Sequence, residues 1–351
     1  MGAVAIFVTM YFADSIACAR PISMSKTVIL PLLSSGDFIS GQLIADTLGV
    51  SRTAVWKQLK KLEDLGLSIE SVKGRGYRIP GGIELLDEAQ IKAGLTAQSE
   101  ALLTTLVIDE VTDSTNSEAL RRVAQGARAG VVCTAEQQSS GRGRRGRSWV
   151  SPYARNVYVS LVGEFTQGAA ALEGMSLAVG VGVARALERS GISGVQLKWP
   201  NDILYEGAKL GGILLEMVGD AAGSCQLAIG VGLNVAMPER AAQAIDQEWT
   251  DVTRIADTGG VACPGRNELL SALLNELLPL IADFETKGFA AWRQSWEALD
   301  AHAGKSIILR SGDGEMAGVA LGVNERGALQ LETTLGIQSV FGGEISLREA
   351  K

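Results

Sequence analysis

The stretch Gly141 to Trp149, Gly-Arg-Gly-Arg-Arg-Gly-Arg-Ser-Trp, constrains the fold of this chain more than any other, with four arginines and three glycines in one short window. Glycines at this spacing disfavour a stable helix and let backbone N–H groups approach a ligand closely. The guanidinium groups between them suit phosphate or carboxylate oxygens. The stretch therefore predicts an anion-binding loop, although such a run taken alone is more often a solvated basic turn or a nucleic-acid patch.

Length and charge bound the organisation of the chain. A chain of 351 residues predicts two or three compact units. The net charge of −7 argues against a protein that coats nucleic acid over its whole surface. Residues 25–80 nevertheless carry eight Lys/Arg against five Asp/Glu, so any contact with DNA is expected to be local to this segment.

The few cysteines and the single histidine exclude several kinds of site. Cys18, Cys133, Cys225 and Cys263 lie far apart, and His302 is the only histidine. A zinc site or a Ser-His-Asp mechanism is therefore not expected, and no dedicated metal site is predicted. Free thiols of this kind fit a reducing cytoplasm.

An apolar run near the start of the chain, residues 2–12, imitates a signal peptide. It lacks a basic segment before it and is too short to span a bilayer, so no membrane attachment is predicted. We expect residues 1–24 to be an N-terminal extension from a non-native, upstream start, with Met24 as the candidate true start.

Residues 40–66 have the pattern of a helix-turn-helix. Serines at positions 40 and 51 are placed to cap two helices, and Gly49 supplies the turn between them. Leu43, Ile44 and Leu48 form the apolar side of the first helix; the second has Val55, Leu59 and Leu62. Residues 67–79 predict a two-stranded wing with a basic turn. The residues expected to contact DNA are Ser51, Arg52, Thr53, Trp56, Lys57, Lys60, Lys73 and Arg75. The alternative is a small module for protein contact or dimerisation.

The remainder of the chain predicts an α+β fold. Strands and helices alternate irregularly, as in a domain built on a mixed sheet. Short strands separated by turns in the last 50 residues predict a small SH3-like β-barrel. The expected parts are an extension (1–24), a winged helix-turn-helix domain (25–80), a catalytic domain (81–300) and the C-terminal barrel (301–351).

Short polar and basic motifs lie between the predicted strands. They are Asp113-Ser-Thr-Asn116, the arginine loop, Lys198-Trp-Pro-Asn-Asp202, Lys209-Leu-Gly-Gly212 and Gly230-Val-Gly-Leu-Asn234. Ser114 to Asn116 suit either a helix cap or a compact polar ligand. Trp149 suits either adenine stacking or the core. Asp202 fits a Mg²⁺ ligand and a general base equally well.

This ordered series of motifs resembles the biotin protein ligases and, with the N-terminal segment, the bifunctional ligase and biotin-operon repressors of bacteria. The resemblance covers about residues 26 to 349 and implies a biotin/lipoate-ligase-like catalytic domain. It implies that ATP and biotin, with Mg²⁺, form biotinyl-5′-adenylate, which then biotinylates a lysine of the carboxyl carrier protein of acetyl-CoA carboxylase. It further implies a homodimer that forms with ligand and binds the operator DNA of biotin genes.

The resemblance also assigns site residues. The catalytic set is Arg142, Lys198, Asp202 and Lys209. The biotin-binding set is Ser114, Thr115, Asn116, Gln138, Arg142, Gly143, Arg144 and Lys209. The ATP- or adenylate-binding set is Arg144, Trp149, Lys198, Asn234 and Trp249. The chain departs from the family at Gly211, where alanine is common. The alternatives are a regulator that senses the adenylate with little transfer activity, or a lipoate/octanoate-type ligase.

Overall fold

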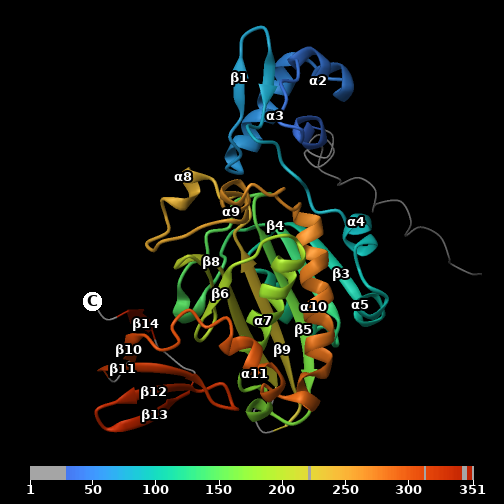
Figure 1. Ribbon diagram of the computed structural model, residues 1–351. Helices are drawn as coiled ribbons and strands as arrows, with labels where there is room; N and C mark the ends of the chain where they lie inside the picture. Colours follow the sequence, from blue (N-terminus) through green and yellow to red (C-terminus); the bar gives the residue numbers. More distant parts are fainter. Residues whose placement is uncertain (1–28, 220–222, 312–313, 342–345, 350–351) are drawn as a thin grey trace, which may run out of the picture. The chain divides into compact units, whose positions relative to one another are not determined.

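The computed structural model describes residues 29–349 apart from 220–222, 312–313 and 342–345 (Figure 1). The predicted extension, residues 1–24, and the candidate true start of the protein, Met24, lie outside the described residues. The chain divides into two compact units, Met1–Ile83 and Glu84–Lys351, which are considered separately. Among the described residues, no helix is both long enough and apolar enough to cross a membrane.

The first unit contains the predicted helix-turn-helix. Helix α2 (Gly41–Leu48) begins at the Ser40 cap and ends at Gly49, whose φ of 64° is the left-handed conformation that glycine adopts readily. Helix α3 (Arg52–Asp64) begins at Ser51, whose hydroxyl accepts a 3.2 Å hydrogen bond from the Ala54 N–H. Strands β1 (Glu70–Val72) and β2 (Gly76–Arg78) pair antiparallel and form the wing.

Burial in this unit follows the predicted pattern with one correction. Val55, Leu59 and Leu62 of α3 are buried, as expected. In α2, however, Leu43, which the helical spacing predicts on the apolar side, is 50% exposed. Ile44 and Ala45 are the buried residues of that helix. A helix of eight residues can bury only a narrow stripe, and here that stripe starts one residue after Leu43.

A seven-stranded mixed sheet forms the centre of the second unit, in the order β3-β4-β5-β9-β8-β7-β6. Only β3 and β4 are parallel; all other neighbours are antiparallel. The strands are β3 (Thr105–Thr112), β4 (Val131–Gln138), β5 (Val157–Phe165), β6 (Val195–Lys198), β7 (Asp202–Tyr205), β8 (Ala208–Gly219) and β9 (Cys225–Leu233).

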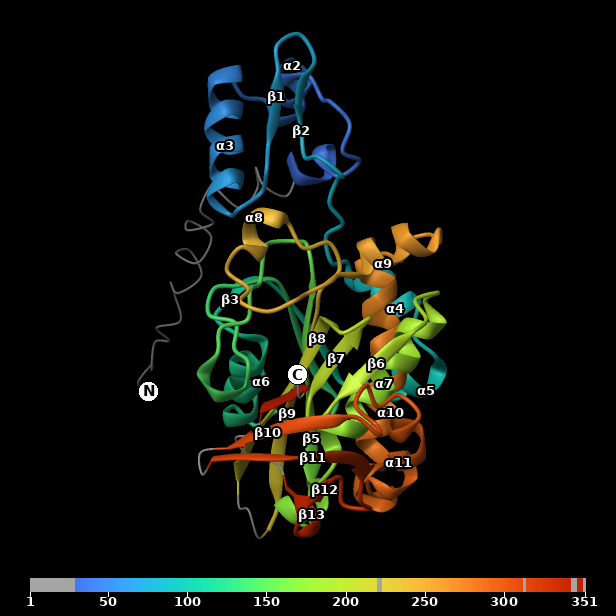
Figure 2. The ribbon, with the colours of Figure 1, turned by 60° about the vertical axis from the view of Figure 1, so that its left-hand side comes forward.

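Helices cover both faces of this sheet. Alternate residues of β4 belong to different cores: Val132 joins the large cluster with α7 (Met175–Arg189) and α10 (Arg266–Lys287), while Val131 and Cys133 join a smaller one. The smaller cluster includes Ala119 and Val123 of α6 (Thr115–Ala124). Because successive strand residues point to opposite faces, α6 lies on the face away from α7 and α10, as Figure 2 shows.

The remaining helices lie around this core. They are α4 (Glu88–Ala93), α5 (Ala97–Leu102), α8 (Glu239–Ala242), α9 (Val252–Gly259) and α11 (Ala290–Glu297). The apolar run from Leu102 to Asp109 predicts a strand that starts at Leu102, but β3 begins instead at Thr105. Thr96 caps a helix that continues to Leu102, its hydroxyl accepting from the Ser99 N–H. Local capping thus overrides the apolar run at that point.

The C-terminal strands form a five-stranded antiparallel sheet, in the order β13-β12-β11-β10-β14, at the position of the predicted barrel (Figure 2). The strands are β10 (Ser306–Ser311), β11 (Gly314–Val323), β12 (Leu329–Thr333), β13 (Gly336–Val340) and β14 (Ser346–Glu349). The indole N–H of Trp199 donates to the Gly327 carbonyl at 3.0 Å, which joins this sheet to the turn between β6 and β7.

Candidate active site

One cavity of about 760 Å³ in the second unit is lined by every residue that the sequence assigns to biotin or ATP. These residues come from the ends of several strands and from the loops that follow them. They are Ser114, Thr115, Asn116, Gln138, Arg142, Gly143, Arg144, Trp149, Lys198, Asp202, Lys209, Asn234 and Trp249. Residues separated by more than 130 positions in the sequence therefore share one site.

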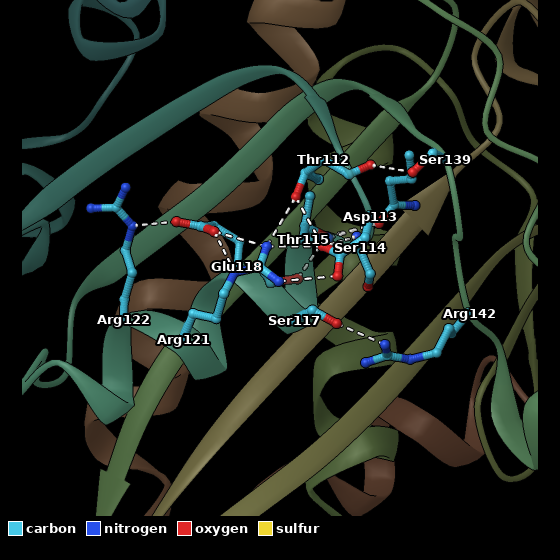
Figure 3. A network of polar contacts seen from close by, with 12 residues as sticks. Thr112, Asp113, Ser114, Thr115, Ser117, Glu118, Arg121, Arg122, Ser139 and Arg142 are labelled. Carbon is cyan, nitrogen blue, oxygen red and sulfur yellow. Dashed lines mark hydrogen bonds and ion pairs between the residues drawn. The ribbon is translucent and has the colours of Figure 1, made fainter.

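The polar part of the site is the turn between β3 and α6 (Figure 3). Ser114 precedes the helix, but its side chain makes no capping hydrogen bond. Thr115 donates through its N–H (2.9 Å) and its hydroxyl (3.2 Å) to Oε1 of Gln138, at the end of β4. Two predicted biotin-binding residues from neighbouring strand ends are thus joined directly.

Asp113 holds this turn in place. Its carboxylate accepts from the Ser114 N–H at 2.8 Å and from both terminal nitrogens of Arg121 at 3.0 and 2.9 Å (Figure 3). The Arg121 hydrogen bonds are the main reason that the pKa of Asp113 lies well below its usual range. The Ser140 N–H donates to the Asp113 carbonyl, so the same turn also holds the start of the arginine loop.

Asn116 is almost fully buried, and all of its amide is used within the protein. Its Nδ2 donates to the Leu214 carbonyl at 3.2 Å and to Oε2 of Glu216 at 2.8 Å. Its Oδ1 accepts from the Ser160 hydroxyl at 2.6 Å. A Cβ at Gly230 would lie 2.3 Å from this oxygen, so β9 needs glycine there.

The arginine loop closes on itself. The Trp149 N–H donates to the Gly141 carbonyl and the Gly143 N–H to the Arg147 carbonyl, each at 2.8 Å. The only helical turn is the short 3₁₀ segment η1 (Arg144–Gly146), in which Arg145 has a φ of 59°. The sequence prediction that this stretch forms a loop and no stable helix is confirmed.

Two arginines of the loop have different surroundings. Arg142 donates to the Ser117 hydroxyl at 2.7 Å and forms an ion pair of 2.9 Å with Glu216. Arg144 is more buried, and desolvation is the main cause that lowers its pKa. It also donates to Oδ1 of Asn201 at 3.3 Å.

The hairpin between β7 and β8 contributes a partly buried ion pair. Nζ of Lys209 lies 2.7 Å from Oδ1 of Asp202, and both side chains are less than a fifth exposed. Asp202 is paired in register with Lys198 at the end of β6. The Lys209 ammonium also lies 5.7 Å from the centre of the Trp149 ring.

Trp149 lies at the boundary between the cavity and the sheet. It lines the cavity, and it also packs closely on β9. A Cβ at Gly232 would lie only 2.7 Å from Cε2 and Nε1 of the indole. The glycine therefore permits the close approach of the ring to the strand.

The far wall contains Asn234 and Trp249. Asn234 is buried and donates to the Thr250 carbonyl at 3.1 Å. Trp249 forms a bridge with Lys209, and the Arg254 guanidinium lies 3.8 Å from the centre of its ring. The segment with Trp249 thus forms part of the cavity wall.

Several residues of the site escaped the sequence analysis. Glu216 and Ser160 contact the predicted set, and Asn201 lies inside a quoted motif without an assigned role. The available signal was a polar residue within an apolar strand, β8 for Glu216 and β5 for Ser160. That signal marks an unusual position, but it does not identify the partner.

In the first unit, the residues predicted to contact DNA lie at the surface. Arg52, Thr53, Trp56, Lys57 and Lys60 are exposed on α3, and Lys73 and Arg75 are exposed at the turn of the wing. Ser51 is exposed as well, although its hydroxyl serves as the helix cap. Lys60 is paired with Glu63 at 2.7 Å.

The fold and the cavity define the class of protein, a ligase of the Biotin/lipoate A/B protein ligase family, whose model matches residues 108–234. An HTH domain matches residues 26–78, and the Biotin protein ligase C terminal domain matches residues 302–348. The biotin protein ligase from Aquifex aeolicus in complex with biotin and ATP superposes with a TM-score of 0.58 at 26% identity, covering 71% of this chain and 100% of that one.

The chain belongs to the family of bifunctional ligase/repressors. It is 38% identical to the bifunctional ligase/repressor BirA of Escherichia coli over 92% of this chain and 97% of that protein. It is 31% identical to the protein of the same name from Bacillus subtilis, over 90% of this chain and 95% of that protein. Both halves of the family's name have a counterpart here, a ligase domain and an HTH domain.

Proposed function

We propose that this chain joins biotin to the adenylyl group of ATP, forming biotinyl-5′-adenylate and releasing pyrophosphate, and then transfers the biotinyl group to a lysine of a carboxyl carrier protein, releasing AMP. The observation that carries the proposal is the convergence of the polar Ser114–Asn116 turn and four cationic side chains on one cavity. These four, which the resemblance assigns to the site, are Arg142, Arg144, Lys198 and Lys209; Arg145 and Arg147 of the same loop also line the cavity. A pocket of this size, with polar groups at one end, suits a small ligand with a compact polar head.

The cationic side chains address the electrostatic difficulty of the first step. A carboxylate must attack the α-phosphate of a triphosphate, and the two anions repel each other. Arg142 and Arg144 stay protonated and can neutralise both groups without being acylated. Lys198 and Lys209, from strands on either side of β7, supply further positive charge where the phosphates would lie.

Asp202 is proposed to hold Lys209 in position, because the two form a 2.7 Å ion pair. Among the described residues, no group of three or more His, Cys, Asp or Glu side chains could hold a metal. Mg²⁺ prefers to keep several waters and to bind substrate phosphates with one or two carboxylates. We therefore propose that Mg²⁺ enters with ATP and that Asp202, which lines the cavity, is a candidate protein ligand for it.

The winged helix unit is proposed to act as the repressor part. Its exposed basic residues on α3 and at the wing tip suit the major groove and the adjacent phosphates. We propose that the DNA is the operator of biotin genes, that the adenylate favours a homodimer, and that the carrier belongs to acetyl-CoA carboxylase. A cytoplasmic location follows from this proposal, since ATP, the carrier and DNA are all found there.

The test is transfer of labelled biotin to a carboxyl carrier domain in the presence of Mg-ATP. We expect labelling of the carrier lysine that depends on ATP and is not supported by lipoate. Binding of biotin, without release of pyrophosphate or labelling of the carrier, would contradict the enzymatic proposal and leave a regulator that only senses its ligand.

A further inference from the structure

Glu216 lies where the arginine loop meets the Ser-Thr-Asn turn. It is a residue of β8, and its side chain is 29% exposed. Its carboxylate accepts hydrogen bonds from Arg142 through both oxygens, at 3.0 and 2.9 Å. The same carboxylate accepts from Nδ2 of Asn116 at 2.8 Å. One acid therefore links two parts of the site that are 26 residues apart in the sequence.

The two partners of Glu216 differ in what they can do. Asn116 is buried, and its amide groups all have protein partners, so it is fixed in place. Arg142 has a longer side chain that is 38% exposed, and it reaches its contacts from a loop. Figure 3 shows its guanidinium pointing toward Ser117, to whose hydroxyl it donates. Arg142 is therefore the partner that can leave Glu216.

A substrate anion and the Glu216 carboxylate compete for the same guanidinium. Each would be stabilised by Arg142, and each repels the other when both lie beside it. A carboxylate or a phosphate that binds Arg142 must therefore displace Glu216, at least in part. The cost of that exchange is subtracted from the affinity for the anion.

We propose that Glu216 is a positioning residue that holds Arg142 in the empty site and is exchanged for an oxygen anion of the substrate. This inference rests on the proposed function, in which Arg142 binds the biotin carboxylate or the phosphates of ATP. Glu216 thereby lowers the affinity for the anion and keeps the arginine loop ordered before the substrate arrives.

The experiment measures dissociation constants for charged ligands and for their neutral counterparts with Glu216→Gln. Glutamine keeps an oxygen that accepts from Asn116 but loses the charge that competes for Arg142. The ligand pairs are biotin against biotinamide and ATP against adenosine, which separate a carboxylate from a phosphate. We expect tighter binding of one anion, by up to about fivefold, because ion pairs of this exposure contribute about 1 kcal/mol or less. Binding of the matching neutral ligand should not change.

The matched control is Glu164→Gln. Glu164 lies on β5, is 27% exposed and pairs with Arg128 away from the cavity. The Glu164→Gln variant should leave the dissociation constants for biotin, biotinamide, ATP and adenosine unchanged. In the Arg142→Gln background, Glu216→Gln should have no further effect on anion binding, because the competition is already absent.

The outcomes separate this inference from the proposed function. Equal changes for the charged and neutral ligands, or weaker or unchanged anion binding by Glu216→Gln, would overturn it. If the wild-type protein binds neither biotin nor ATP, the proposed function itself fails. If Glu216→Gln does not fold, the test uses Glu216→Asp, which draws the carboxylate back by one methylene group. This variant must lower the dissociation constant of the anion relative to that of its neutral counterpart, but by less than Glu216→Gln would. An unchanged ratio of these two constants would also overturn the inference.

Discussion

Replacing Gly232 with alanine should force the indole of Trp149 away from β9. The new methyl group would lie 2.7 Å from Cε2 and Nε1 of the ring and 2.9 Å from Cζ2. Favourable contact between carbon atoms needs about 3.5–4.0 Å, so the ring must move by roughly 1 Å. Overpacking of this kind costs about 1–3 kcal/mol. Because the ring also lines the cavity, we expect the cost to appear in ligand binding as well as in stability.

The assay compares thermal unfolding with the kinetics of adenylate formation. A loss of 1–3 kcal/mol should lower Tm by about 2–4 °C per kcal/mol for a unit of this size. If the whole cost fell on ATP binding, KM for ATP would rise by about fivefold for a cost of 1 kcal/mol and by about 150-fold for a cost of 3 kcal/mol. We expect KM for biotin to change less, because Trp149 is proposed to contact the adenylate and not the head of biotin.

Two further variants make this prediction specific. Gly259→Ala is the control, because its new methyl group would meet only Cγ2 of Val261, at 3.9 Å. Trp149→Phe should partly restore the stability of Gly232→Ala, since the smaller ring leaves room for the methyl group. A Gly232→Ala protein with the Tm and KM for ATP of the wild type would refute the reasoning.

Three other predictions follow from the charged residues. Arg266 and Glu136 are buried and 2.7 Å apart, so Arg266→Met should destabilise the protein by about 3–5 kcal/mol in urea unfolding, and adding Glu136→Gln should recover part of that loss. The pKa of Asp113 is lowered in the folded state, so its contribution to stability is present above about pH 4 and lost as the pH falls further. Asp113→Asn should therefore show a smaller loss of stability between pH 7 and pH 3 than the wild type; an equal loss would count against this. Lys57→Gln should reduce the slope of log K against log salt for operator DNA by about 1, and an unchanged slope would mean that Lys57 contacts no phosphate.

The parts of the fold that the sequence predicted are those with local signals. Ser40, Gly49 and Ser51 lie next to the helices that they cap, so the two helices of the first unit could be placed closely. Apolar runs predicted the strands of the mixed sheet in the same way. The start of β3 was misplaced because a local cap, Thr96, extended the preceding helix into the apolar run.

The contacts that organise the site could not be predicted, because they join distant residues. Asn116 meets Glu216 across 100 positions, and Ser160 meets Asn116 across 44. No short window of sequence contains both partners. The resemblance predicted which residues belong to the site. Which of their charges form ion pairs depends on how the strands are arranged in the sheet, and the sequence does not give that arrangement.

The glycines of β8 and β9 illustrate how the site dictates strand composition. Gly230 admits the side chain of Asn116, and Gly232 admits the ring of Trp149. Gly211, the departure from the family's alanine, faces the Gly232 carbonyl, which would lie 2.8 Å from an added Cβ. An alanine there would require the two strands to shift slightly. Glycine at this position is therefore consistent with the close pairing of β8 and β9 and leaves the proposed chemistry unchanged.

Two of the cationic groups proposed to bind substrate anions already have carboxylate partners. Arg142 is paired with Glu216, and Lys209 is paired with Asp202. Binding of a carboxylate or a phosphate at either place is then an exchange of partners, and its net free energy is the difference between two ion pairs. Such a site gains less affinity from each charge than an unpaired cation would provide, but the Lys209 ammonium, whose side chain is only 16% exposed, keeps a carboxylate partner when no anion is bound. Thr115 and Gln138, by contrast, have neutral hydrogen-bonding atoms, so a ligand that binds them would exchange hydrogen bonds and no charge.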